Sequence, residues 1–272
     1  MRHQALISNA HSVTGNDPLS DDQIRRVAPS IFADGAHDSR SSRYAYIPTI
    51  EVLNALRKEG FQPFMVAQSR VRTDDRREHT KHMLRLRHST GITAAEANEV
   101  VIINSHDGTS SYQMFAGVLR FVCMNGMICG EGLSALRVLH TGDVVDNVIE
   151  GAYTIINEFE RIDQNKERMR SITLSPRQQL AFGKAALSLK YDDAPPVTPE
   201  QVIAPKRVAD VGSDLWRTFN RVQENLLKGG QPGTSTTGRR LTTRKVTGIH
   251  TDVKLNRALW TLADALADKV GA

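Results

Sequence analysis

The residues best suited to covalent chemistry lie in one short run, Asn104-Ser105-His106-Asp107-Gly108, which holds a hydroxyl, an imidazole and a carboxylate. Neighbouring residues of a turn cannot adopt the geometry of a nucleophile, a base and an orienting carboxylate, so the run is interpreted as a turn. Cys129 has apolar neighbours that disfavour a reactive thiolate, and it is interpreted as a buried thiol. Paired carboxylates, a phosphate loop and a zinc pattern do not occur at a diagnostic spacing. The sequence therefore predicts no enzyme, no catalytic residue, no metal and no cofactor.

Basic residues offer a different chemistry, the neutralisation of phosphates. Period-two alternation places Arg70 and Arg72 on one face of an expected strand, and Lys81, Arg85 and Arg87 on one face of its expected partner. If the two stripes face the same way, they form a row of phosphate donors whose binding depends on salt. Asp74, Asp75 and Glu78 lie in the intervening turn and would partly cancel that field. The alternative is that the basic residues only protect a solvated strand edge.

A second basic element lies near the carboxyl end, set among glycines and without an acidic residue. Its members are Lys228, Arg239, Arg240, Arg244 and Lys245. Glycine and serine predict a mobile cationic loop that orders when it wraps a phosphate backbone. An exposed linker without function is the alternative. Arg137 and Arg170 are weaker candidates for phosphate contact.

Aromatic side chains beside basic residues could stack the bases of a single strand. Most of those around the expected sheet are nevertheless predicted to be core residues. They are Tyr44, Tyr46, Phe61, Phe64, Tyr112, Phe115 and Phe121.

The elements that must position these residues are those of an α+β protein. Helical spacing predicts a helix that opens at Ser20 and another over 49–59, and alternation predicts two hairpins, 61–72 with 80–88 and 99–105 with 110–120. A glycine-rich corner over 123–132 precedes a long helix from 143 to 162 and a further helix that begins at Ser175-Pro176. Two more helices are expected around residues 215–226 and 255–266. The predicted fold is an antiparallel sheet with a long helix packed on it, a β-β-β-α-like core, followed by a helical carboxyl-terminal region.

Composition sets the domain limits and the class of protein. The 272 residues carry a net charge of +5, and 24% of them are charged and 40% hydrophobic, which is close to the globular average. We predict an arm over 1–42, an α+β core over 43–190, a proline-rich linker or draped loop over 191–212, and a helical region with the basic loop over 213–272. No signal peptide or membrane-length apolar run occurs in the sequence, so the cytoplasm is the expected location and no membrane is an expected partner.

Several short motifs together resemble a known family. They are Tyr46-Ile47-Pro48-Thr49, Gln68-Ser69-Arg70-Val71-Arg72, Lys81-His82-Met83-Leu84-Arg85 and Phe121-Val122-Cys123-Met124-Asn125-Gly126. The family is the phage- and plasmid-type domain of unknown function number 932, and the resemblance covers roughly residues 15 to 190. The family name implies no activity.

A more distant likeness carries a functional expectation. Tyr46-Ile47, Val52, Asn54 and Gly60-Phe61, followed by antiparallel strands and a long helix, resemble the Rad-fifty-two type of single-strand annealing protein. That resemblance implies a ring or helical homo-oligomer that holds single-stranded DNA by its backbone, with the bases exposed and without metal or nucleotide. The second hairpin and the different tail depart from that pattern.

The sequence therefore predicts a protein of a phage, plasmid or other mobile element that binds and anneals single-stranded DNA in recombination. Its predicted contacts are Arg70, Arg72, Lys81, Arg85, Arg87, Arg239, Arg240, Arg244 and Lys245. One alternative is a protein-interaction module, an inhibitor or anti-defence factor that uses the tail helices as its partner surface. A nuclease is a third possibility, and it would need acidic metal ligands that converge from separate segments.

Overall fold

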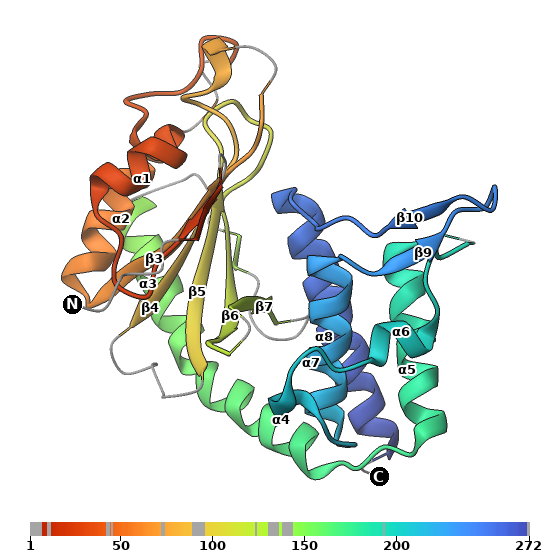
Figure 1. Cartoon of the computed structure of the whole chain (residues 1–272). Coiled ribbons are helices and arrows are strands. Elements are labelled where there is room, and N and C mark those ends of the chain that lie inside the picture. Colours follow the sequence, from red (N-terminus) through yellow and green to blue (C-terminus); the bar gives the residue numbers. More distant parts are fainter. Residues whose placement is uncertain are drawn as a thin grey trace, which may run out of the picture. The chain divides into compact units, whose positions relative to one another are not determined.

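The computed structural model describes residues 7–9, 12–41, 44, 46–71, 74–88, 96–122, 124–129, 136–137, 144–192 and 194–270. The chain forms two compact units, Met1–Leu119 with Gly132–Phe159 and Arg120–Glu131 with Glu160–Ala272. The first unit contains an antiparallel sheet and the second is mainly helical (Figure 1). The predicted α+β class is confirmed. The division between the units falls near the start of α4 rather than in the proline-rich stretch.

The sheet of the first unit follows the order β1-β2-β3-β4-β5-β6, and β8 also pairs with β6. Its strands are β1 (Ile7–Asn9), β2 (Ser12–Thr14), β3 (Phe61–Gln68), β4 (His82–His88), β5 (Glu96–Asn104), β6 (Gln113–Arg120) and β8 (Leu136–Arg137). The β3–β4 hairpin and the β5 and β6 strands lie where alternation predicts them. Sequence neighbours are spatial neighbours throughout this order, as is typical of an antiparallel meander.

The β3–β4 hairpin sets the register of the central strands. Phe61 pairs with His88 and Gln68 with His82, and the register shifts between Pro63 and Met65. Proline has no N–H to give to the ladder, so an irregularity beside it is expected. The short 3-10 helix η2 (Asp74–Arg76) lies between the two strands.

The amino-terminal segment is more than the predicted arm, because β2 joins the sheet by pairing antiparallel with β3. The helix predicted at Ser20 is confirmed as α1 (Asp21–Val27), with Ser20 and Gln23 forming a reciprocal capping box. A 3-10 turn, η1 (Pro29–Phe32), follows it. The segment is therefore built into the first unit.

Two helices of the first unit pack against one another and on the sheet. Helix α2 (Thr49–Lys58) buries Val52, Leu53 and Leu56 and contacts β3, while α3 (Val144–Asn157) contacts β5. The prediction of one long helix over 143–162 is wrong in one respect. The helix is interrupted at Glu158, and α4 (Phe159–Ser171) begins at the next residue. The Glu158 N–H instead bonds to the Ile155 carbonyl at 3.1 Å.

The second unit has a helical core with a short strand and a hairpin. Its further elements are α5 (Pro176–Lys190), α6 (Pro199–Ile203), the 3-10 turn η4 (Val208–Asp210), α7 (Leu215–Lys228), α8 (Ile249–Val270), β7 (Asn125–Ile128), β9 (Pro232–Thr234) and β10 (Arg240–Thr242). Trp216, Phe219 and Trp260 bring their rings together in the core, with the Phe219 and Trp260 centroids 6.0 Å apart. Almost every residue of α7 is buried, which makes it the central helix of this unit.

The proline-rich stretch is draped over this core rather than free. Val197 and Val202 are buried, and a Thr198 cap begins the short helix α6. The Asn225 side-chain amide of α7 donates to the carbonyls of Val202 at 2.7 Å and Ala204 at 2.9 Å. Side-chain amides thus satisfy backbone groups that would otherwise be buried without a partner.

Candidate nucleic-acid interface

The arginines of β4 lie in the interior of the first unit. Arg85 and Arg87 are only 4% and 2% exposed. Their Nε atoms lie 3.0 Å and 2.9 Å from the carboxylate oxygens of Glu99 on β5. The expectation that these two side chains project into solvent is wrong, because two guanidinium groups share one buried carboxylate.

The sheet register explains this arrangement. Arg85 pairs with Val101, two residues from Glu99, so the carboxylate lies on the same face of the sheet as both arginines. The Arg87 guanidinium also lies 4.1 Å from the centroid of the Phe64 ring. Because Glu99 is completely buried, its removal would take a compensating charge away from both cations.

Arg70 and Lys81 lie just outside the paired strands, after β3 ends and before β4 begins. Arg70 is exposed and Lys81 is half-buried. Both line the same open pocket at this end of the sheet. Arg72 lies outside the described residues. Of the predicted basic stripes, the structure thus places Arg70 and Lys81 together at an accessible surface.

The second basic element is an ordered hairpin, not the predicted mobile loop. Strands β9 and β10 pair antiparallel, with Arg240 opposite Thr234 and Thr242 opposite Pro232. In Figure 1 the hairpin projects from the helices of its own unit. Four of its predicted contact residues are exposed in the hairpin or in the segment that follows it: Arg239, Arg240, Arg244 and Lys245.

Hydrogen bonds hold the base of the hairpin against the helical unit. The Thr234 N–H donates to the Pro196 carbonyl at 2.8 Å, and the Gln201 amide donates to the Pro232 carbonyl at 2.8 Å. At Gly233 a Cβ atom would lie 2.3 Å from the Pro196 oxygen, so only glycine allows this approach. The cations of the hairpin are therefore presented by a fixed backbone.

The charged residues of the hairpin and of its flanking sequence are all basic. No aspartate or glutamate occurs between Glu224 and Asp252 in the sequence. In the part of the chain that the structure describes, no ion pair joins Arg239, Arg240 or Arg244 to a carboxylate. Lys228 differs, because its Nζ lies 3.2 Å from Glu224 Oε1. The exposed cations thus keep their full charge available to an anionic partner.

The two weaker candidates contribute little. Arg170 forms an ion pair with Glu167 on the same helix, and its guanidinium lies 5.6 Å from the Trp216 ring centroid. Arg137 belongs to β8, but its side chain is not among those that the structure describes.

The aromatic side chains of the sheet offer little stacking surface. Four of the seven are buried: Phe61, Phe64, Tyr112 and Phe115. Tyr44 and Tyr46 are half-buried, and their hydroxyls donate to the carbonyls of Ser105 and Ala33. Phe121 is half-buried. The prediction that most of these rings are core residues is confirmed.

A buried polar network around two histidines was not predicted from the sequence. His82 accepts or donates hydrogen bonds at both ring nitrogens, to Ser30 Oγ at 2.8 Å and to Thr49 Oγ1 at 3.0 Å. His106 lies beside it, with ring centroids 5.1 Å apart. The alternation of β4, which places His82 on the same face as Leu84 and Leu86, was the available signal.

This network keeps both histidines neutral near pH 7. Burial and, to a lesser extent, the neighbouring His106 lower the pKa of His82 to about 3. Burial also lowers the pKa of His106 to about 4, with His79 as the second cause. A proton on either ring would place a charge in the interior. Acid pH should therefore destabilise the first unit at this cluster.

The residues first considered for chemistry have structural roles here. Asp107 accepts hydrogen bonds from the N–H and hydroxyl of Thr109, at 3.0 and 2.6 Å, as in an Asx turn. Cys129 is a buried free thiol, as predicted. Within the described ranges, no group of three or more histidine, cysteine, aspartate or glutamate side chains is arranged to hold a metal ion. Among the same residues, no helix has the length and apolar character needed to cross a membrane.

Comparison with known proteins shows the family of this chain. The chain belongs to the family described as domain of unknown function (DUF932), whose model matches residues 36–260. The match extends well beyond residue 190, so the helical unit with the hairpin is part of the family pattern. The predicted family resemblance is confirmed.

Two relatives come from Escherichia coli (strain K12) and are the UPF0380 protein YafZ and the UPF0380 protein YfjQ. Each is 51% identical to this chain over 258 residues, which is 94% of this chain and 94% of the relative. No solved structure matches the chain. The likeness to annealing proteins of the Rad-fifty-two type therefore stays a prediction from the sequence.

Proposed function

We propose that this protein binds the backbone of single-stranded DNA through the β9–β10 hairpin and the segment that follows it. The observation that carries the proposal is the exposure of Arg239 and Arg240 in the hairpin and of Arg244 and Lys245 in the segment that follows it, within a stretch of sequence that lacks aspartate and glutamate. Guanidinium groups form strong, charge-assisted hydrogen bonds with phosphate oxygens. A preformed hairpin loses less conformational entropy on binding than the mobile loop predicted from the sequence.

The buried arginines of β4 are not part of this proposal. A polyanion could reach Arg85 and Arg87 only after their contacts with Glu99 were broken, which would leave that carboxylate buried without its partners. Binding is therefore assigned to the hairpin, with Arg70 and Lys81 as a second set of contacts. Backbone contacts position a strand without reading its sequence, so little sequence preference is expected.

Strand annealing within a homo-oligomer is the finer form of the proposal. It would serve recombination of a phage, plasmid or other mobile element, and its support is the sequence resemblance to annealing proteins. Annealing requires phosphates to be screened while bases remain available, which backbone contacts provide. No nucleophile, metal or nucleotide is needed for it.

The test compares two double variants of exposed cations. Arg239→Ala with Arg240→Ala should weaken binding to labelled oligo-dT by about tenfold, the loss expected for two charge-assisted contacts at a solvated surface. Arg177→Ala with Lys184→Ala is the matched control, because both side chains are exposed on α5. It should change affinity less than about twofold. Equal affinity of the hairpin variant and the wild-type protein would remove the hairpin from the interface.

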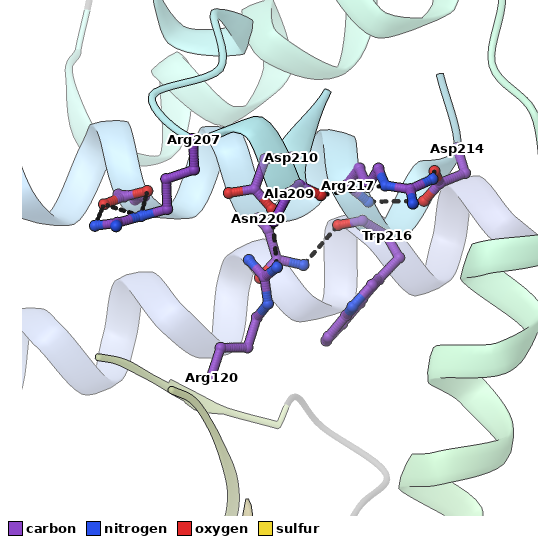
Figure 2. A network of polar contacts seen from close by, with 9 residues as sticks. Arg120, Arg207, Ala209, Asp210, Asp214, Trp216, Arg217 and Asn220 are labelled. Atoms are coloured by element: carbon purple, nitrogen blue, oxygen red, sulfur yellow. Dashed lines mark hydrogen bonds and ion pairs between the residues drawn. The ribbon is translucent and has the colours of Figure 1, made fainter. Parts of the chain in front are cut away.

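A second candidate function is a protein-interaction module, and one observation favours it. Val208 and Val211 in the second unit are 91% and 61% exposed, which is unusual for two large apolar side chains in one turn. The turn is held in place on either side: Arg120 contacts Asp210 at 2.9 Å and Arg207 contacts Glu224 at 2.7 Å (Figure 2). Arg217 adds a contact to the Ala209 carbonyl at 3.3 Å.

The polar network of Figure 2 therefore keeps this apolar turn at the surface. Burial acts to raise the pKa of Glu224, but the hydrogen bond from Arg207 and the charge of Lys228 outweigh it and lower the pKa. Val208→Asp with Val211→Asp should abolish binding to a protein partner while oligo-dT binding is kept. Sedimentation of both proteins shows whether the partner is a second copy of this chain. Unchanged assembly and unchanged capture would remove this candidate.

A further inference from the structure

An open pocket lies at the end of the sheet in the first unit, where two loops meet. One loop joins β3 to β4, and the other is the turn from Asp107 to Thr109 between β5 and β6. The pocket has a volume of about 620 Å³, within the range of roughly 300 to 1,000 Å³ that is usual for small-molecule sites. Its lining residues are Ser69, Arg70, Val71, Asp75, Arg76, Thr80, Lys81, Asp107 and Thr109.

Three cations face this pocket. Arg70 and Arg76 are exposed, and Lys81 is half-buried. Among the described residues, no ion pair joins any of the three to a carboxylate. They differ in this respect from Arg85 and Arg87, which are occupied by Glu99. The pocket thus holds cationic groups that are not already neutralised.

The lining also contains two carboxylates, Asp75 and Asp107. Asp107 Oδ1 accepts two hydrogen bonds from Thr109, and Asp107 is only 6% exposed. Asp75 lies 3.7 Å from the Nε2 atom of His37. Cations outnumber carboxylates in the lining, so the pocket favours an anion over a cation. A carboxylate beside a cationic pocket also suits the hydroxyl or amino donors of a nucleoside.

We propose that this pocket binds a nucleoside phosphate, in particular the phosphorylated end of a nucleic-acid strand. A terminal phosphate monoester carries close to two negative charges at pH 7, whereas an internal diester carries one. Three cations that line one pocket fit the monoester better. Binding of a strand end rests on the proposed function. A free nucleoside monophosphate offers the same phosphate and nucleoside groups without a strand.

The experiment compares labelled oligo-dT of one length with a 5′-phosphate, a 3′-phosphate or hydroxyl ends, by fluorescence anisotropy. We expect at least one phosphorylated form to bind about tenfold more tightly than the hydroxyl form. Arg70→Ala with Arg76→Ala should remove that preference, since both side chains are exposed and their loss should not disturb the fold. Arg26→Ala, an exposed arginine of α1, is the control and should keep it.

Thymidine 5′-monophosphate and inorganic phosphate separate the possible sources of the phosphate. If the nucleotide displaces the phosphorylated strand at a lower concentration than inorganic phosphate does, the result supports a nucleoside site. Equal binding of all oligonucleotide ends together with no displacement by the nucleotide overturns the inference, although hairpin binding could still hold. A third outcome is that the wild-type protein binds the nucleotide but not oligo-dT, and that the Arg70 and Arg76 double variant loses nucleotide binding. This result would support the nucleotide site and contradict the proposed function.

Discussion

Arginines of β4 and arginines of the β9–β10 hairpin have opposite surroundings. Arg85 and Arg87 belong to a central strand, are buried and share Glu99. Arg239 and Arg240 belong to a two-stranded hairpin and are exposed. The residue type and the local pattern are similar, so the difference comes from what pairs with each strand. An arginine on a strand indicates a binding surface only when its neighbouring strands are known.

The largest expected effect concerns Glu99. Glu99→Ala should lower the free energy of unfolding by about 3 to 5 kcal/mol, because two buried guanidinium groups lose the carboxylate that both of them contact. Chemical denaturation measured by circular dichroism gives the value. Glu167→Ala is the matched control, since it breaks the exposed pair with Arg170 and should cost less than about 1 kcal/mol. A similar small loss in both variants would show that the β4 arginines are not dependent on Glu99.

Acid should affect the first unit through its buried histidines. The folded-state pKa values of about 3 for His82 and about 4 for His106 lie below the unfolded value of roughly 6.5. The unfolded chain therefore binds more protons, and the stability present above pH 6.5 is lost as the pH falls toward those values. The loss for each histidine is about 1.4 kcal/mol per pH unit below 6.5.

Urea denaturation at pH 7 and pH 5.5 measures this effect. For the two histidines together, the free energy of unfolding should fall by about 2 to 3 kcal/mol over this interval. His106→Gln removes one titrating group and should reduce the difference by about half. The same stability at both pH values in the wild-type protein would mean that the histidines are not buried in their neutral form.

Glycines at the base of the hairpin test whether its backbone conformation holds the exposed cations in place. Gly229 has a φ of +63°, and a Cβ there would lie 2.6 Å from the Thr243 carbonyl oxygen. Gly229→Ala should destabilise the protein by roughly 1 to 3 kcal/mol and displace the segment that carries Arg244. Gly230 has a φ of +79°, but no atom lies within 4 Å of its Cβ position. Gly230→Ala should therefore cost less, and thermal unfolding of the two variants checks the order.

The smallest expected effect is on stability when hairpin cations are removed. Arg239→Ala with Arg240→Ala should change the free energy of unfolding by less than about 0.5 kcal/mol, because exposed side chains make few contacts. A denaturation curve recorded with the Glu99→Ala variant shows the contrast directly. A large loss in the hairpin variant would mean that these arginines hold the fold, as those of β4 do.

Elements with strong local signals were predictable from the sequence. The capping boxes at Ser20 and Ser175, the helix over Thr49–Lys58 and the β3–β4 hairpin follow from capping residues and periodicity. The break at Glu158 was not predictable, because the apolar period continues across it. The pairing of β2 with β3 was missed for a different reason, since a three-residue strand carries almost no pattern of its own.

The candidate site was predictable only in part. Arg239 and Arg240 stand out as cations in a segment without acid, and their exposure is as expected. The burial of Arg85 depends on the register that brings Glu99 to the same face, which alternation within one strand cannot reveal. Asp107 and Thr109 join Arg70 at the pocket because two loops meet at one end of the sheet. Long-range pairing of this kind requires the fold.

The salt dependence of binding to oligo-dT tests the central claim most directly. The slope of the logarithm of the binding constant against the logarithm of salt concentration counts the phosphates that the protein neutralises, at about 0.7 per phosphate for a single strand. Removing Arg239 and Arg240 should lower the magnitude of the slope by roughly 1.4 if each contacts one phosphate. The same slope in the wild-type protein and this variant would contradict the account, because phosphate contact would then not involve the exposed hairpin.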